Sequence, residues 1–129
     1  MTQAVEIKDA LLSTEVLLGR TPDTPDEDVE KAFATIAHSP DSGIYAGSFQ
    51  GQSAWERHPS GDELVQVIDG MATVTVIIDS EHHVLEMTRG MVTMVPKGCW
   101  HRFDVPDHCS VMTMTPAPTE HFRGEDPTK

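Results

Sequence analysis

Short apolar runs separated by turn-forming residues recur about every 8–12 residues through most of this chain, and this rhythm constrains its fold more than any other feature. Glycine, proline, aspartate and serine mark the breaks between the runs. Such a pattern is typical of an all-β sandwich or barrel, and helix signals are few. The expected strands are residues 44–51, 63–69, 71–78, 83–88, 91–95, 100–105 and 109–115.

The alternation within residues 71–78 indicates how the sheet is used. Ala72, Val74, Val76 and Ile78 share one face of the expected strand, while the face carrying Thr73 and Thr75 is only weakly polar. This is expected when one face lines a closed barrel and the other meets a neighbouring sheet.

The two ends of the chain differ from this pattern. Residues 5–12 fit a helical turn or two, and residues 14–19 fit a short edge strand. Residues 21–30 hold two prolines and five acids, which favours a solvated loop. We therefore expect an N-terminal extension and acidic loop over 1–32, a barrel over 33–116, and an extended, partly ordered tail over 117–129.

Charge and composition narrow the possible partners. The chain has 129 residues, enough for one domain, and its formal net charge of −12 argues against nucleic acid and anionic membranes. No apolar run is long enough to span a bilayer and no signal peptide is evident, so we expect a cytoplasmic protein. Two cysteines are too few for a disulfide framework and are expected to be reduced.

Two of the seven histidines stand beside tight turns next to expected strands. His58 precedes a Pro-Ser-Gly turn and Glu63, and His101 follows the tight turn of residues 96–98. The other five lie in turns or in the tail, where a histidine is usually solvent-exposed. These are His38, His82, His83, His108 and His121.

The surroundings of His58 and His101 resemble the two sequence motifs of the cupin superfamily. Residues 58–70, HPSGDELVQVIDG, are similar to the first motif, with His58, Glu63 and Gly70 at its second histidine, glutamate and final glycine. Residues 90–105, GMVTMVPKGCWHRFDV, are similar to the second motif. The matching residues there are Gly90, Pro96, Gly98 and His101. Two positions depart from the pattern, because Glu56 replaces the first histidine and Val105 replaces the final asparagine.

The resemblance implies an all-β, single-domain cupin β-barrel of the jelly-roll type with a short N-terminal extension, commonly a homodimer. It also implies a divalent transition metal (Fe, Mn, Ni or Zn) held by His58, Glu63 and His101, with Glu56 as a fourth ligand. Strand geometry agrees, since positions 56 and 58 face the same way and the turn that follows can bring Glu63 to the same cavity. Imidazole and carboxylate ligands together tilt the choice slightly toward Mn or Fe. The alternative is that Glu56 points to solvent or pairs with Arg57.

Other residues near these motifs have less specific roles. Cys99 shares a strand face with His101, so it either lies near the metal or is a small buried side chain. Trp100 points the other way and is expected outside the barrel or at an interface. Asp62 is expected to cap its own turn. Five side chains are candidate cavity walls or plain core: Phe49, Val67, Phe103, Met112 and Met114.

Three functions stay open. The first is a metal-dependent enzyme acting on a small molecule, of dioxygenase, isomerase or lyase type, in which Glu63 or Glu56 doubles as general base. The second is a non-catalytic cupin that binds a small molecule, and the third is a metal-free structural domain. One fold hosts many functions, so the site has to decide between them.

Overall fold

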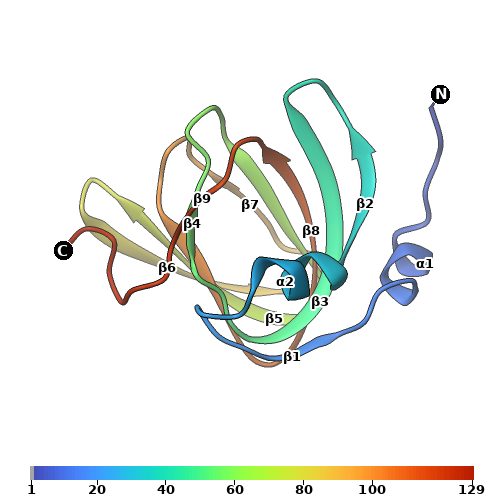
Figure 1. Ribbon diagram of the computed structural model, residues 1–129, viewed down its shortest axis with the longest axis horizontal. Helices are drawn as coiled ribbons and strands as arrows, with labels where there is room; N and C mark the ends of the chain where they lie inside the picture. The colour runs from blue at the N-terminus through green and yellow to red at the C-terminus, as the bar shows by residue number, and fades with distance from the viewer. Residues whose placement is uncertain (1) are drawn as a thin grey trace.

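The computed structural model describes residues 2–129, and most of these residues lie in strands of one strongly curled sheet (Figure 1). The all-β expectation is therefore confirmed. The elements in chain order are α1 (Ile7–Leu12), β1 (Leu17–Arg20), α2 (Asp26–Lys31), β2 (Phe33–His38), β3 (Ser42–Gln52), β4 (Trp55–Arg57), β5 (Glu63–Ile78), β6 (Glu81–Thr88), β7 (Val92–Val95), β8 (His101–Pro116) and β9 (Glu120–Phe122).

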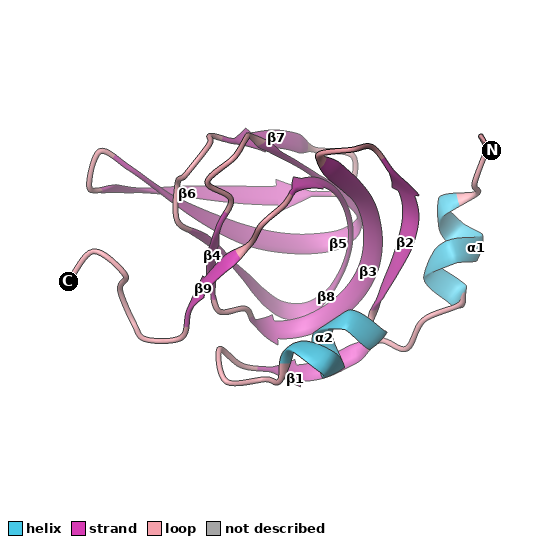
Figure 2. Ribbon diagram, turned by 45° about the horizontal axis from the view of Figure 1, so that its top comes forward, coloured by secondary structure: helices cyan, strands magenta, loops and turns pink. Residues whose placement is uncertain are grey.

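Two long strands, β5 and β8, organise the sheet. They pair with each other in antiparallel register, and β5 also pairs with β7 along its first part and with β6 along its second part. On its other edge β8 pairs with β3 and β4, and these carry β1, β2 and β9. The sheet curls into a half-barrel (Figure 2).

Both long strands run through positions where the sequence predicts breaks. The predicted turn at Asp69 and Gly70 is a bulge inside β5, where the register with β8 shifts. Gly70 has φ of 76°, and a Cβ there would come within 2.8 Å of the carbonyl carbon of His108. The glycine therefore bends one continuous strand instead of ending it. The segment 106–108, expected as a loop, likewise lies inside β8.

The apolar core fills the barrel below its open end. The predicted alternation is confirmed as far as Val76, since Ala72, Val74 and Val76 are buried while Thr73 and Thr75 are not. It ends there, because Ile77 is buried and Ile78 is only half-buried. Phe49 and Phe103 pack edge to face with ring centroids 5.9 Å apart, a favoured geometry for buried aromatic rings. Of the candidate cavity walls, Phe49, Val67 and Phe103 therefore belong to this core.

The N-terminal residues wrap around the barrel. β1 adds to the edge of β3 in parallel, which confirms a short strand near residues 14–19. The expected acidic loop contains α2, because Pro25 sets up its first turn, acids crowd that turn, and Lys31 lies in the last turn. Neither helix within residues 2–129 has the length and apolar character required to cross a bilayer.

The C-terminal tail returns to the open end of the barrel. β9 pairs with β4, and the indole nitrogen of buried Trp55 donates a 2.8 Å hydrogen bond to the carbonyl of Glu125. Residues beyond β8 therefore help to enclose the cavity.

Candidate metal centre

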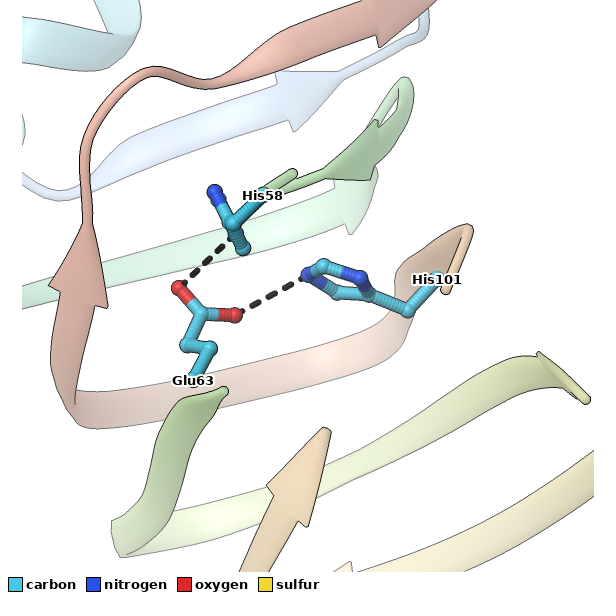
Figure 3. Close-up of side chains that lie close together, drawn as sticks. All are labelled: His58, Glu63 and His101. Atoms are coloured by element: carbon cyan, nitrogen blue, oxygen red, sulfur yellow. Dashed lines mark ion pairs between the residues drawn. The ribbon is translucent and has the colours of Figure 1, made fainter. Parts of the chain in front are cut away.

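Two neighbouring segments of the chain and a third, distant one bring His58, Glu63 and His101 together at the open end of the barrel (Figure 3). His58 directly follows β4, Glu63 is the first residue of β5, and His101 is the first residue of β8. Figure 3 shows both imidazoles facing the carboxylate of Glu63 from different sides.

Two turns that carry these residues bind each other. The amide of Gly98 donates a 3.0 Å hydrogen bond to the carbonyl of His58, and the amide of Lys97 donates to Oδ1 of Asp62 at 2.7 Å. Asp62 thus binds the neighbouring turn, whereas the sequence indicated a cap on its own turn. These contacts fix the distance between the segment of His58 and that of His101.

The three side chains are buried and closely spaced. Nε2 of His58 lies 3.3 Å from Oε2 of Glu63, and Nε2 of His101 lies 3.0 Å from Oε1. One ligand atom from each residue lies within 4.8 Å of the others, a spacing that can hold a metal ion. Side-chain exposure is only 3% for His58, 6% for Glu63 and 1% for His101, so water competes little with these contacts.

The hydrogen bond at Nδ1 of His101 determines which nitrogen of the neutral ring carries the proton. Nδ1 of His101 lies 3.0 Å from the carbonyl of Cys99, which can only accept, so Nδ1 carries a proton. Nε2 of a neutral His101 then presents a lone pair to the Glu63 carboxylate. Among residues 2–129, the buried Nε2 of His58 and Oε1 of Glu63 lack any hydrogen-bond partner. A cation between these atoms satisfies all of them, so the residues present fit a metal ion.

Without a metal, ion pairing with the two histidines keeps the Glu63 carboxylate ionised. Burial alone would raise the pKa of Glu63, but the contacts with His101 and His58 lower this pKa to about 2. Burial likewise disfavours the charged form of His101, but the Glu63 carboxylate outweighs this effect and raises the pKa of His101. The site therefore favours an ionised carboxylate, which is the form that binds metals.

Glu56 lies at the edge of the same cavity but outside the group of three. Its Oε1 is 4.0 Å from Nη2 of Arg20, and its Oε2 is 3.6 Å from Nε2 of His121. The alternative pairing with Arg57 is not found, because Arg57 binds Glu120 at 2.6 Å. Glu56 is thus turned neither to solvent nor toward its neighbour, and its role as a fourth ligand stays a prediction.

The remaining candidates from the sequence lie away from the three side chains. Cys99 is half-buried against the apolar core and contributes only its carbonyl to His101. Trp100 packs outside, against Phe122 and Arg57, as its strand face predicts.

Near the end of β8, the expectation that Met114 lines the cavity or packs in the core is wrong. Met114 is 41% exposed, whereas Thr113 and Thr115 face the cavity. Oγ1 of Thr115 donates a 2.6 Å hydrogen bond to Oε2 of Glu63, which orients that carboxylate. In the tail, Oγ1 of Thr119 lies 3.0 Å from Nδ1 of His58. Strand alternation puts Thr115 on the face opposite Met114 without saying which face is inside, and nothing in the sequence places Thr119.

A cavity of about 310 Å³ opens beside Glu63, at the small end of the range for small-molecule sites. Its polar wall includes Arg20, Glu56 and Thr115, and its apolar wall includes Phe33 and Tyr45. A small ligand in this cavity reaches the carboxylate of Glu63 directly.

Comparisons with known proteins agree with this architecture. The family model described as a cupin domain matches residues 48–115, more than half of the chain. No curated protein matches the sequence significantly.

Several solved structures share the fold. A protein with a cupin-2 domain from Shewanella frigidimarina is 22% identical, with a TM-score of 0.53 over 66% of this chain and 79% of that one. A protein from Neisseria meningitidis is 15% identical, with a TM-score of 0.65 over 89% of this chain and 100% of that one. A hydroquinone 1,2-dioxygenase, in complex with Cd²⁺ and 4-hydroxybenzonitrile, is 18% identical, with a TM-score of 0.56 over 65% of this chain and 63% of that one. At these identities the likeness concerns the fold alone. With the family model, the curled sheet and both motifs in agreement, this chain belongs to the cupin family.

Proposed function

We propose that this protein is a metal-dependent cupin that acts on a small molecule, with a divalent transition metal bound by His58, Glu63 and His101. The observation that carries the proposal is the set of buried, mutually facing acceptor atoms with no hydrogen-bond partner among residues 2–129. Two imidazoles and one carboxylate form a ligand set that suits Fe or Mn, with Ni and Zn as alternatives.

The reaction we propose is of dioxygenase, isomerase or lyase type. A bound metal would polarise an oxygen-bearing substrate or activate O₂ or water. The dioxygenase among the structural relatives supports a reaction of this kind on the same fold, as does its complex with a metal and a small aromatic molecule.

The protein's own residues prepare the site for that chemistry. The Cys99 carbonyl fixes the ring of His101, Thr119 fixes that of His58, and Thr115 orients Glu63. Glu56 borders the cavity without belonging to the group of three, so we assign it the role of general base. A base at this position can take a proton from a substrate while Glu63 stays bound to the metal.

Elemental analysis of freshly purified protein tests the proposal, together with thermal melts with and without a chelator. We expect about one transition-metal ion per chain and a lower melting temperature after chelation. Less than about a tenth of an equivalent, after incubation with Fe, Mn, Ni and Zn in turn, would refute the metal-dependent function.

A metal-free cupin is the second candidate. The 3.0 Å separation between His101 and Glu63 also fits an imidazolium–carboxylate pair, which would make the cluster a structural network or the lining of a ligand pocket. In that case chelation would leave the melting temperature unchanged.

A homodimer is part of the proposal. Met94, Leu64 and Met114 are neighbours across β7, β5 and β8 on the outer face of the sheet, and both methionines are more than 40% exposed. A second copy would cover this apolar row. Light scattering at several concentrations measures the mass, and a monomer throughout would refute the dimer.

A further inference from the structure

Arg20 is a buried cation without a hydrogen bond from its guanidinium group. It is the last residue of β1, and only 8% of its side chain is exposed. Among residues 2–129 its guanidinium nitrogens make no hydrogen bond, and the nearest carboxylate oxygen is 4.0 Å away. Burying a charge is costly unless the charge is paired and hydrogen-bonded, so the position calls for an anionic partner.

The position of the Arg20 side chain follows from the way β1 pairs with β3. β1 pairs in parallel with β3, so that Arg20 is opposite Gly51. A Cβ at position 51 would come within 2.6 Å of the backbone nitrogen of Arg20, and Gly51 has φ of 115°. Only glycine allows β1 to approach β3 this closely, and this approach carries the guanidinium into the barrel.

The groups nearest the guanidinium leave its donors free. The side chain lies over the ring of Phe49, 4.7 Å from the centroid, which holds it in place. Glu56 is its nearest carboxylate, at 4.0 Å, which is an ion-pair distance but too long for a hydrogen bond. Phe49 thus holds the Arg20 side chain in place, and Glu56 offsets part of its charge. The guanidinium N–H groups stay available to donate hydrogen bonds.

Arg20 shares a cavity with Glu63, one of the three candidate metal ligands. Both residues line the cavity of about 310 Å³, so a ligand in it can reach both. Phe33, Tyr45 and Pro116 also line this cavity, and they suit a short apolar or aromatic body. The cavity therefore combines a cationic group, apolar side chains and the carboxylate of Glu63.

The charges favour an anionic ligand, and this step rests on the proposed function. With a divalent cation bound, the cation and Arg20 exceed the negative charge of Glu56 and Glu63 by one unit. Glu30 also borders the cavity but is exposed, so solvent screens it. A monoanion would neutralise the occupied site.

We propose that Arg20 binds the carboxylate of the substrate, so that this site takes small carboxylic acids with a short apolar or aromatic body. The guanidinium donates two parallel hydrogen bonds to a carboxylate, an arrangement that a neutral amide cannot match. The rest of the molecule then lies along Phe33 and Tyr45, toward Glu63.

Calorimetric titration with benzoate and its neutral analogue benzamide tests the proposal. We expect metal-loaded protein to bind benzoate at least about tenfold more tightly than benzamide. Arg20→Met should weaken benzoate binding about 10- to 100-fold and leave benzamide binding unchanged. Arg20→Lys, which keeps the charge but loses the paired donors, should fall between. Arg89→Met, in the exposed turn between β6 and β7, is the matched control and should bind like the unaltered protein.

Three results would overturn the proposal: no benzoate binding, equal affinity for benzoate and benzamide, or unchanged benzoate affinity in Arg20→Met. The last would show that Arg20 only balances Glu56. The comparison of the two probes in unaltered protein keeps the test decisive if Arg20→Met fails to fold. Elemental analysis of the same samples separates this inference from the proposed function. Protein without metal whose benzoate binding depends on Arg20 would refute the metal centre and support carboxylate recognition.

Discussion

Asp62 accepts a 2.7 Å hydrogen bond from the backbone amide of Lys97, and this contact joins the two turns that carry the candidate metal ligands. A second bond between these turns runs from the amide of Gly98 to the carbonyl of His58. The spacing between His58 and His101 therefore depends on a side chain that touches neither of them.

Asp62→Ala removes the acceptor for the Lys97 amide while leaving all three candidate ligands in place. We expect about a tenfold loss of metal affinity, since groups that position ligands typically contribute this much. Asp62→Asn keeps an acceptor oxygen at the same place and should retain most of the affinity. Titration of metal against a competing chelator measures the difference. Equal affinities in Asp62→Ala and the unaltered protein would show that the turns hold their geometry without this bond.

His58→Ala and His101→Ala should each abolish stoichiometric metal binding, because each removes one of three ligands. His82→Ala is the control, since His82 faces Asp126 at 3.5 Å, outside the site. Glu56→Gln should keep its metal, because we assign Glu56 the role of general base; a large loss of metal would show instead that Glu56 is a ligand. Metal content per chain is the measurement. Similar content in all three histidine variants would mean that the wrong histidines are assigned.

The cluster of His58, Glu63 and His101 was predicted through the resemblance of residues 58–70 and 90–105 to the two cupin motifs. Strand alternation and the turn after His58 agree with that assignment. Arg20 and Thr119 could not be predicted, since each reaches the cavity through pairing with a distant segment. Arg20 depends on how closely β1 approaches β3.

The strands show the same limit. Alternation in β8 separates Met114 from Thr115, but it cannot say which of the two faces is inside. Asp69 and Gly70 fit a turn by composition, and only the partner strand makes them a bulge. The sequence pattern therefore predicted which segments form strands better than it predicted where each strand begins and ends.

The metal-free protein should lose stability in acid through Glu63. The pKa of Glu63 is lowered to about 2 in the folded protein, from 4.5, so its stabilising effect is complete above about pH 4.5 and is lost as the pH falls toward 2. The pKa of His101 is raised, and this residue is protonated in both states over that window, so it adds no slope there. Thermal melts of the chelated protein from pH 6 to pH 2 should show a steeper decline than those of Glu63→Gln. Parallel curves for the two proteins would contradict the assignment.

Gly70 and Gly90 allow backbone strain to be separated from steric overlap. Both have positive φ, 76° and 88°, so alanine at either position costs about 1–2 kcal/mol in backbone strain. A Cβ at Gly90 meets no atom within 4 Å, whereas one at Gly70 runs into the backbone of His108 in β8. Gly70→Ala should therefore destabilise the protein clearly more than Gly90→Ala, because β5 must also move away from β8 at the bulge. Urea unfolding of both variants measures the difference in free energy, and equal losses would show that the bulge adapts freely to a side chain.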